Sequence, residues 1–197
     1  MAEVYKFKVR LSELEDYIWR DIEITSLSSV AKLGYAILAA FSGTASHLFC
    51  IHANEKRYEF VYEYADLSDD EIFNPVIAKL ASLKLNIGNS LMMEYDYGAG
   101  WKFDVELVSI SEMKKGTGTH YPYITDGKGN GIIEDTSPST LLEYIEQTEK
   151  EGTLPTYYDM DLDREAEWDY RKCDLEYLNA LYKFKISMIK DAYENID

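Results

Sequence analysis

The sequence predicts an α+β protein with a mostly antiparallel sheet built from hairpins, packed helices, and a C-terminal helical extension. Three observations predict this class. Apolar and polar residues alternate at period two in several segments, most clearly over residues 101–110. The strand-like segments come in pairs joined by short polar turns, which favours antiparallel pairing. Segments with the helical spacing of apolar residues lie between and after these pairs.

The first pair of strands lies at the N-terminal end. Residues 5–11 alternate strictly, and residues 17–24 return to the pattern after a polar turn. The simplest arrangement pairs the two segments antiparallel. Ser28 or Ser29 can then cap a helix whose apolar positions run from Val30 to Phe41. We expect this helix to pack on the sheet and to end by Gly43.

A second hairpin is expected from residues 47–51 and 57–60, joined by a turn over residues 53–56. The acidic residues 66–71 suit the start of a helix, because acids near a helix N-terminus interact favourably with its dipole. Val76, Ile77, Leu80 and Leu83 would form the buried stripe of that helix.

The central segment, residues 90–110, reads as the third hairpin. Its first strand is rich in aromatic and apolar residues, and its second strand places apolar residues on one face and charged residues on the other. Gly98 and Gly100 are expected to supply the positive φ angles that a short hairpin loop requires.

The C-terminal third has weaker patterns. Residues 114–137 hold five glycines and predict a long irregular loop. A helix is expected from Ser139 or Thr140, with Leu141, Leu142 and Ile145 buried. A hinge near residues 151–155 would separate a domain over 1–150 from an acidic linker and a C-terminal amphipathic helix over 151–197. The stripe predicted for that last helix consists of Leu175, Leu178, Leu181, Phe184 or Lys185, Ile189 and Tyr193.

Composition excludes several classes of function. The chain has 197 residues and a formal net charge of −16. Because nucleic-acid affinity comes largely from Lys and Arg displacing counterions, direct DNA or RNA binding is not expected. No window approaches the roughly 18 apolar residues of a membrane span, and the first residues lack a signal-peptide pattern. We therefore expect a cytoplasmic protein that does not associate with membranes.

Several separate motifs resemble the plasmid pRiA4b ORF-3-like family. The resemblance covers about residues 4–145 and implies a compact α+β domain, but no established reaction. The matching motifs are Tyr17-Ile18-Trp19-Arg20-Asp21-Ile22, Ala39-Ala40-Phe41 followed by His47-Leu48, Tyr95-Asp96-Tyr97-Gly98-Ala99-Gly100-Trp101, and Asp126-Gly127 followed by Glu134-Asp135.

This chain departs from the family pattern at several polar positions. The resemblance implies that family members usually have a histidine where this chain has Phe49, an acid where it has Ala99 and a histidine where it has Phe103. It also implies that they often have cysteines where this chain has Ile124 and Gly131. If the family's polar cluster binds a metal or performs acid–base chemistry, this chain has replaced much of the cluster with apolar residues.

The remaining polar residues define a candidate ligand site. The candidates are His47, Asp96, Tyr97, Trp101, Glu134 and Asp135. Asp96 lies among aromatic residues, so desolvation could raise its pKa and suit it to act as a general acid or to hold a ligand. The alternative is that its side chain caps the glycine turn, as Asp commonly does near turns.

No metal or cofactor is predicted. His47 and His52 are five residues apart, which would place them on opposite faces of one strand. A site of His47 with Asp96 and Glu134 or Asp135 remains the alternative to a hydrogen-bonded structural histidine. The acidic residues 159–165 lack the glycine and the final bidentate acid of a calcium loop. Cys50 and Cys173 have no partner at metal-binding spacing and are read as buried thiols. No nucleophile elbow or phosphate-binding loop is present in the sequence.

The pattern favours a non-enzymatic protein-binding or scaffold module. Its expected contact surfaces are the acidic residues 159–165 and the C-terminal helix. These surfaces would bind a protein partner or a second copy of the chain. The alternative is a small-molecule-binding protein or diverged enzyme with a pocket near the Asp96–Trp101 hairpin. A third possibility, a nucleic-acid accessory of mobile elements, follows only from the family's genomic associations, and the net charge argues against it.

Overall fold

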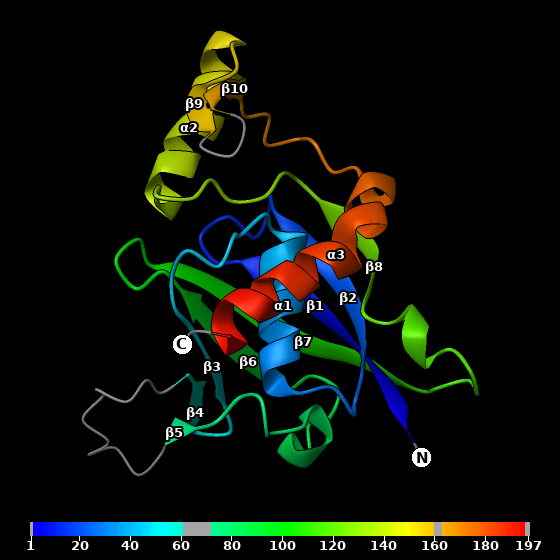
Figure 1. Ribbon diagram of the computed structural model, residues 1–197. Coiled ribbons are helices and arrows are strands. Elements are labelled where there is room, and N and C mark those ends of the chain that lie inside the picture. Colours follow the sequence, from blue (N-terminus) through cyan, green and yellow to red (C-terminus); the bar gives the residue numbers. More distant parts are fainter. Residues whose placement is uncertain (1, 61–71, 160–162, 196–197) are drawn as a thin grey trace.

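A computed structural model describes residues 2–60, 72–159 and 163–195 and confirms the α+β class (Figure 1). Its strands are β1 (Glu3–Leu11), β2 (Trp19–Thr25), β3 (Phe49–Ala53), β4 (Lys56–Glu59), β5 (Ile72–Phe73), β6 (Ser90–Tyr95), β7 (Trp101–Glu112), β8 (Tyr123–Lys128), β9 (Thr156–Asp159) and β10 (Arg164–Glu167). Its helices are α1 (Val30–Ala40), α2 (Pro138–Glu151) and α3 (Leu175–Glu194), with short 3-10 turns η1 (Leu80–Leu83) and η2 (Gly118–His120).

The main sheet has eight strands in the order β5-β4-β3-β6-β7-β1-β2-β8. Every pairing between neighbours is antiparallel except that of β4 with β5. The three predicted hairpins β1–β2, β3–β4 and β6–β7 are all present. They join into one sheet because β1 pairs with β7 and β3 pairs with β6.

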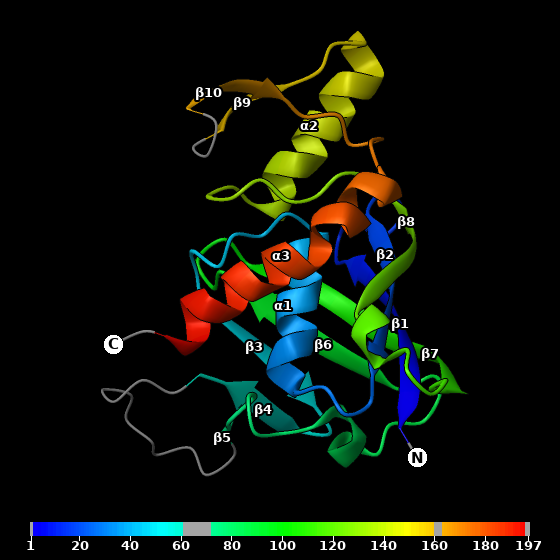
Figure 2. The same cartoon turned by 45° about the vertical axis from the view of Figure 1, so that its right-hand side comes forward.

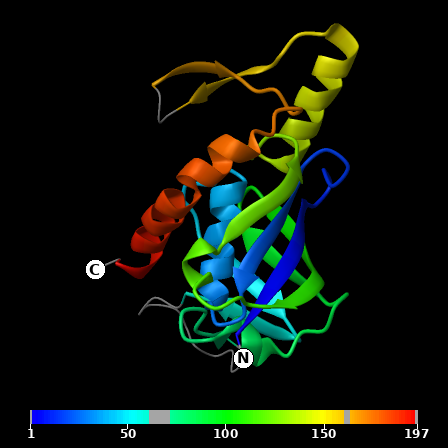
Figure 3. The same ribbon diagram turned by 90° about the vertical axis from the view of Figure 1, so that its right-hand side faces the viewer.

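Helix α1 lies between the sheet and α3, so the molecule has three layers (Figures 2 and 3). The helix begins after Ser29, whose side chain accepts a hydrogen bond from the backbone N–H of Lys32. Ten of its eleven residues are buried. A helix that is apolar all round is stable only when it is covered on all sides, and here the sheet and α3 provide that cover.

The stripe predicted for the C-terminal helix is only partly correct. Ile189 and Tyr193 are buried as expected, but the other buried positions are Tyr182 and Ile186, and Phe184 is 66% exposed. The helix carries apolar residues on two faces, so spacing alone does not select the buried one. Contact with α1 decides it, since the Tyr182 hydroxyl donates a hydrogen bond to the α1 backbone.

Two segments that were expected to be irregular form strands. Within residues 114–137, β8 pairs with the edge of β2. Its outer edge is covered by Asn179 of α3. The side-chain amide of Asn179 accepts a hydrogen bond from the Ile124 N–H and donates one to the Ile124 carbonyl. In the expected acidic linker, β9 and β10 form a second, two-stranded sheet. These segments are rich in glycine and acidic residues and show no alternating pattern of their own. They form strands because they pair with other strands.

The prediction of a helix with buried residues from Val76 to Leu83 is wrong. Only the short turn η1 forms there, and Ile77 is 75% exposed. The backbone carbonyls of Pro75 and Ala78 instead accept hydrogen bonds from the first N–H groups of α1. Those N–H groups have no partner within their own helix. Residues 75–77 form a turn in place of the expected helix, and the carbonyl groups of this segment cap α1. The predicted acidic start of this helix, residues 66–71, lies outside the described residues.

Helix α2 and the β9–β10 hairpin extend away from one end of the sheet (Figures 1 and 3). We call residues 138–167 the arm. Helix α2 begins at Pro138, one or two residues before the expected start at Ser139 or Thr140. It buries the predicted Leu141 and Ile145, whereas Leu142 is only partly buried. No helix in the described ranges is sufficiently long and apolar to cross a bilayer.

Candidate functional site

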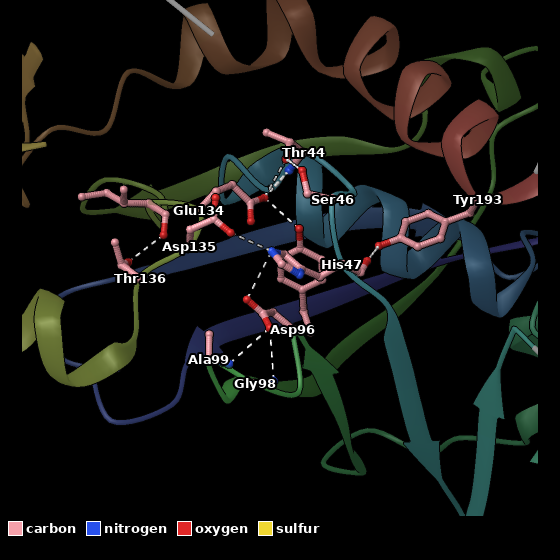
Figure 4. A network of polar contacts seen from close by, with 12 residues as sticks. Thr44, Ser46, His47, Asp96, Gly98, Ala99, Glu134, Asp135, Thr136 and Tyr193 are labelled. Carbon is pink, nitrogen blue, oxygen red and sulfur yellow. Dashed lines mark hydrogen bonds and ion pairs between the residues drawn. The ribbon is translucent and has the colours of Figure 1, made fainter. Parts of the chain in front are cut away.

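The structure brings His47 and two carboxylates together (Figure 4). The His47 Nε2 atom lies 3.4 Å from Asp96 Oδ2 and 3.1 Å from Asp135 Oδ1. His47 lies in the loop before β3, Asp96 follows β6, and Asp135 lies in the segment between β8 and α2. Three segments that are distant in sequence therefore meet at one imidazole.

Asp96 also forms the turn of the β6–β7 hairpin. Its φ of 47° is left-handed, and Gly100 has a φ of 78°, whereas Gly98 does not adopt the positive φ expected for it. The Asp96 Oδ1 atom accepts hydrogen bonds from the backbone N–H groups of Gly98 and Ala99 at 3.2 Å each. The predicted role as turn cap is therefore present, and Oδ2 remains to face His47.

Glu134 is held beside this group by three donors. Its Oε1 atom accepts hydrogen bonds from the Thr44 backbone N–H at 2.5 Å, the Thr44 hydroxyl at 3.0 Å and the Tyr95 hydroxyl at 2.8 Å. Burial, followed by the charge of Glu134, raises the pKa of Tyr95 above its ordinary value, so this phenol remains a proton donor. Its role is to position Glu134.

Helix α3 reaches the same network. The Tyr193 hydroxyl donates a hydrogen bond to the backbone carbonyl of His47 (Figure 4). The Tyr95 ring meets the imidazole edge-on, with the ring centroids 5.9 Å apart. The last turn of α3 therefore fixes the loop that carries His47. The contacts of His47 Nε2, Asp96 and Glu134 Oε1 are those of a structural junction. The buried Glu134 Oε2 atom, in contrast, has no hydrogen-bond partner among the described residues.

Two of the six predicted residues lie apart from this junction. Trp101 is fully buried, and its Nε1 has no hydrogen-bond partner among the described residues. Tyr97 is 45% exposed, and its hydroxyl donates to Glu59 at 2.5 Å. Phe49 and Phe103, at positions where the family resemblance implies histidines, are completely buried. The junction therefore comprises His47, Asp96, Glu134 and Asp135.

A cavity of about 570 Å³ lies elsewhere, between α1, α3 and the segment that contains η2. None of the six predicted residues lines it. Three lysines do: Lys32 of α1, and Lys183 and Lys190 of α3. Hydroxyl groups and the rings of Tyr35 and Tyr121 complete the wall. Glu194 is the one acidic residue that lines it, so the charged groups around the cavity are mainly positive.

The three lysines differ in their partners. Lys183 donates a hydrogen bond to the Thr119 carbonyl, and Lys190 lies 3.8 Å from Glu194. Lys32 is half-buried and forms no hydrogen bond or ion pair through its ammonium group with any described residue. Burial, and then the charges of Lys183, Lys190 and Lys79, lower the pKa of Lys32.

Sequence reasoning missed this cavity, although two signals for it exist. Lys32 is the one charged residue in the apolar sequence of α1. On α3, Lys183 and Lys190 are seven residues apart, which places them on one face of the helix. Only the packing of α3 on α1 brings these two signals together.

Comparisons with known proteins support the fold. A family model described as plasmid pRiA4b ORF-3-like protein matches residues 3–177. A crystal structure of a protein of unknown function from Methanosarcina mazei Go1 is similar, with a TM-score of 0.69 and 21% sequence identity over 89% of this chain and 97% of that one. No curated protein sequence gives a significant match.

Proposed function

For this chain, which belongs to the plasmid pRiA4b ORF-3-like family, we propose a binding function: it holds a small anionic molecule in the cavity between α1 and α3. The observation that carries this proposal is the half-buried Lys32, which faces two further lysines and has no partner of its own among the described residues. Like charges brought together at partial burial are unfavourable, and an anion would relieve that cost.

The location of these lysines supports the proposal. The whole chain has 36 acidic and 20 basic residues, so a cavity whose wall carries three lysines and one acid departs from the average surface. A pocket lined with groups of one charge concentrates ligands of the opposite charge. A titratable group in a cavity whose pKa is shifted by burial and by neighbouring charges, as that of Lys32 is lowered here, is also a general sign of a functional site.

The lining indicates the class of ligand. A volume of about 570 Å³ falls within the range of small-molecule sites, roughly 300–1,000 Å³. Two or three ammonium groups suit a molecule with at least two negative charges, such as a phosphorylated metabolite or a di- or tricarboxylate. Ser29, Ser187 and Thr119 can accept or donate further hydrogen bonds, and Tyr121 with Pro122 offers apolar contact.

Thermal unfolding with a panel of anions tests this function. Phosphate, pyrophosphate, succinate and citrate should be compared with sodium chloride at matched ionic strength and with neutral glucose. An anion at about a hundred times its dissociation constant should stabilise the protein by roughly 2.7 kcal/mol, which is a rise of roughly 5–10 °C.

The matched variants are Lys32→Met, which removes the charge from the cavity, and Lys150→Gln on the exposed surface of α2. Lys150 forms a solvent-exposed pair with Glu146 and does not line the cavity. The shift should disappear in the first variant and persist in the second. A shift of equal size in all three proteins would contradict the proposal.

A second candidate function, binding of a basic protein partner, is favoured by the arm. Residues 138–167 contain nine acidic and two basic residues, and the described parts of the arm, α2 with β9 and β10, extend away from the sheet (Figure 3). Tyr158 is 54% exposed there. Replacing Glu143, Glu146 and Glu149 with Gln should abolish capture of such a partner and leave the thermal unfolding midpoint nearly unchanged.

Self-association through the C-terminal helix would have to use its exposed apolar residues, which include Phe184 of the predicted stripe but neither Ile189 nor Tyr193. The stripe that includes Ile189 and Tyr193 is buried against the body of the same chain. Tyr177, Phe184 and Met188 remain 56–66% exposed on the outer side of α3. If copies associate through this helix, Phe184→Asp should convert a dimer to a monomer in light scattering. Cytoplasmic location stays a prediction.

A further inference from the structure

A second polar cluster lies on the face of the sheet opposite to α1. Cys50 and His52 are two residues apart on β3, and Glu94 lies directly across from Cys50 on β6. Because side chains alternate along a strand, these three point to the same side, whereas Phe49 and Tyr95 point into the core. Cys50 is fully buried, and Glu94 and His52 are about a quarter and a third exposed.

The three ligand atoms of this cluster converge. The Cys50 Sγ atom lies 3.3 Å from His52 Nε2 and 3.6 Å from Glu94 Oε2, and His52 Nε2 lies 3.3 Å from the same Glu94 oxygen. Zinc binds sulfur at about 2.3 Å and nitrogen or oxygen at about 2.0–2.2 Å. At tetrahedral angles such ligands are about 3.4–3.6 Å apart. The triangle in the structure has nearly these dimensions.

The surrounding strands hold the triangle in place. Cys50 and Glu94 are opposite residues in an antiparallel pair, so their separation is set by the sheet. The other Glu94 oxygen, Oε1, lies 3.8 Å from the Lys102 ammonium. This contact orients the carboxylate so that Oε2 faces the cluster, which is the usual role of a neighbour behind a metal ligand.

The geometry does not fit a catalytic relay of thiol, imidazole and carboxylate. Such a relay uses both ring nitrogens, one toward the thiol and one toward the carboxylate. Here the sulfur and the carboxylate oxygen both approach Nε2. Burial also raises the pKa of the Cys50 thiol to about 11, so without a cation the thiol stays protonated near neutral pH.

We propose that Cys50, His52 and Glu94 form a binding site for a divalent zinc-type cation. Thiolate, imidazole and carboxylate together favour zinc over magnesium or calcium, which prefer oxygen ligands alone. Two negative ligands balance the charge of the ion. Three protein ligands leave a fourth position for water or another small ligand. Binding displaces the thiol proton to solvent.

Cobalt absorption tests the site directly, because a thiolate bound to Co²⁺ produces a charge-transfer band in the near ultraviolet. The full chain, freed of metal with EDTA and dialysed, is titrated with Co²⁺ and then with Zn²⁺. The variants are Cys50→Ser and His52→Gln. Cys173→Ser is the matched control, since it removes the other cysteine, which is 78 residues or more from β3 and β6 in sequence and lies beside Gly127 instead.

We expect one equivalent of Co²⁺ to produce the band in the wild-type chain and in Cys173→Ser, and Zn²⁺ to abolish it. Cys50→Ser should lack the band, and His52→Gln should bind at least about tenfold more weakly. Circular dichroism checks that each variant is folded. His52 is partly exposed, so its variant remains informative if Cys50→Ser does not fold. Absence of the band in the folded wild-type chain, or its persistence in Cys50→Ser, would overturn the proposal.

Discussion

Asp96 performs two tasks with its two oxygens. Oδ1 accepts hydrogen bonds from the backbone N–H groups of Gly98 and Ala99, while Oδ2 faces His47. The residue also adopts a left-handed φ of 47°, a conformation that Asp and Asn tolerate better than other residues with a side chain. The turn chemistry, rather than the charge, should therefore account for most of its contribution to stability.

Substitution at Asp96 separates these tasks. Asp96→Ala loses the cap and places alanine at a positive φ, so it should lower the free energy of unfolding by about 1–2 kcal/mol. Asp96→Asn keeps an acceptor and the favourable backbone conformation, so the change should stay within about 0.5 kcal/mol. Urea denaturation measures both. A large loss in the asparagine variant would show that the contact with His47 is the more important one.

Lys32 carries an unfavourable charge in the unliganded protein. Three other lysines lower its pKa in addition to burial. Lys32→Met keeps most of the aliphatic stem and removes the charge, so it should raise the unfolding midpoint by about 1–3 °C. The same variant should lose anion binding. A lower midpoint would indicate that Lys32 stabilises the native chain through a contact of its own.

The lowered pKa also sets a pH dependence for binding. Only protonated Lys32 attracts an anion, and its pKa lies below the ordinary value for lysine of 10.5. Anion affinity should therefore fall as the pH rises, beginning at lower pH than for an exposed lysine. Because the bound anion favours the protonated form, binding should take up protons in this range. Titrations in buffers of different ionisation enthalpy measure this uptake.

At the scale of elements, the docking of α3 on α1 completes the fold. Tyr182, Ile186, Ile189 and Tyr193 belong to the same apolar core as the sheet residues. Removing every residue after Leu154 would therefore expose α1 as well as remove an extension. Point substitutions are the better test of this helix, because they leave the rest of the packing in place.

Adjacent residues of α3 give a matched pair for that test. Ile189 is 3% exposed and Met188 is 56% exposed. Ile189→Ala should lower the free energy of unfolding by about 2–4 kcal/mol through lost burial and the cavity left behind. Met188→Ala should change it by less than about 0.5 kcal/mol. Equal effects of the two substitutions would contradict the observed orientation of the helix.

Elements whose apolar residues recur at a regular spacing within one segment could be predicted from the sequence. The three hairpins, α1 and the existence of α3 all follow from alternation or helical spacing within a single segment. The strand β8 could not be found in this way, because its residues 123–128 pair with the edge of β2 and with Asn179 of α3. Likewise, η1 replaces a helix because its segment caps α1. Contacts between segments override local preference in both cases.

The same limit applies to the sites. His47, Asp96, Glu134 and Asp135 could be grouped from the sequence because they lie in motifs that resemble one family. Cys50 and His52 are two residues apart on β3 and so share one face, but their partner Glu94 becomes visible only with the register of β3 against β6. The lysine cavity needs the packing of two helices whose lysines are about 150 residues apart in the chain.

At the scale of the whole molecule, charge is distributed unevenly. The chain has a net charge of −16, and the arm contains nine of its 36 acidic residues. The cavity between α1 and α3 is the described concave site where lysines converge. The net negative charge of the chain would repel large polyanions such as nucleic acids, whereas the lysine-lined cavity would still admit a small anion. This distribution favours a small ligand over a nucleic acid.

The most direct measurement of the central claim is isothermal titration of pyrophosphate and citrate into the full chain at constant ionic strength. The account predicts saturable binding of one molecule per chain. It further predicts affinity about 10- to 100-fold weaker in Lys32→Met, as expected for loss of one charge-assisted hydrogen bond, and unchanged affinity in Lys150→Gln. Absence of saturable binding by either anion, or equal affinity in Lys32→Met and the wild-type chain, would contradict it.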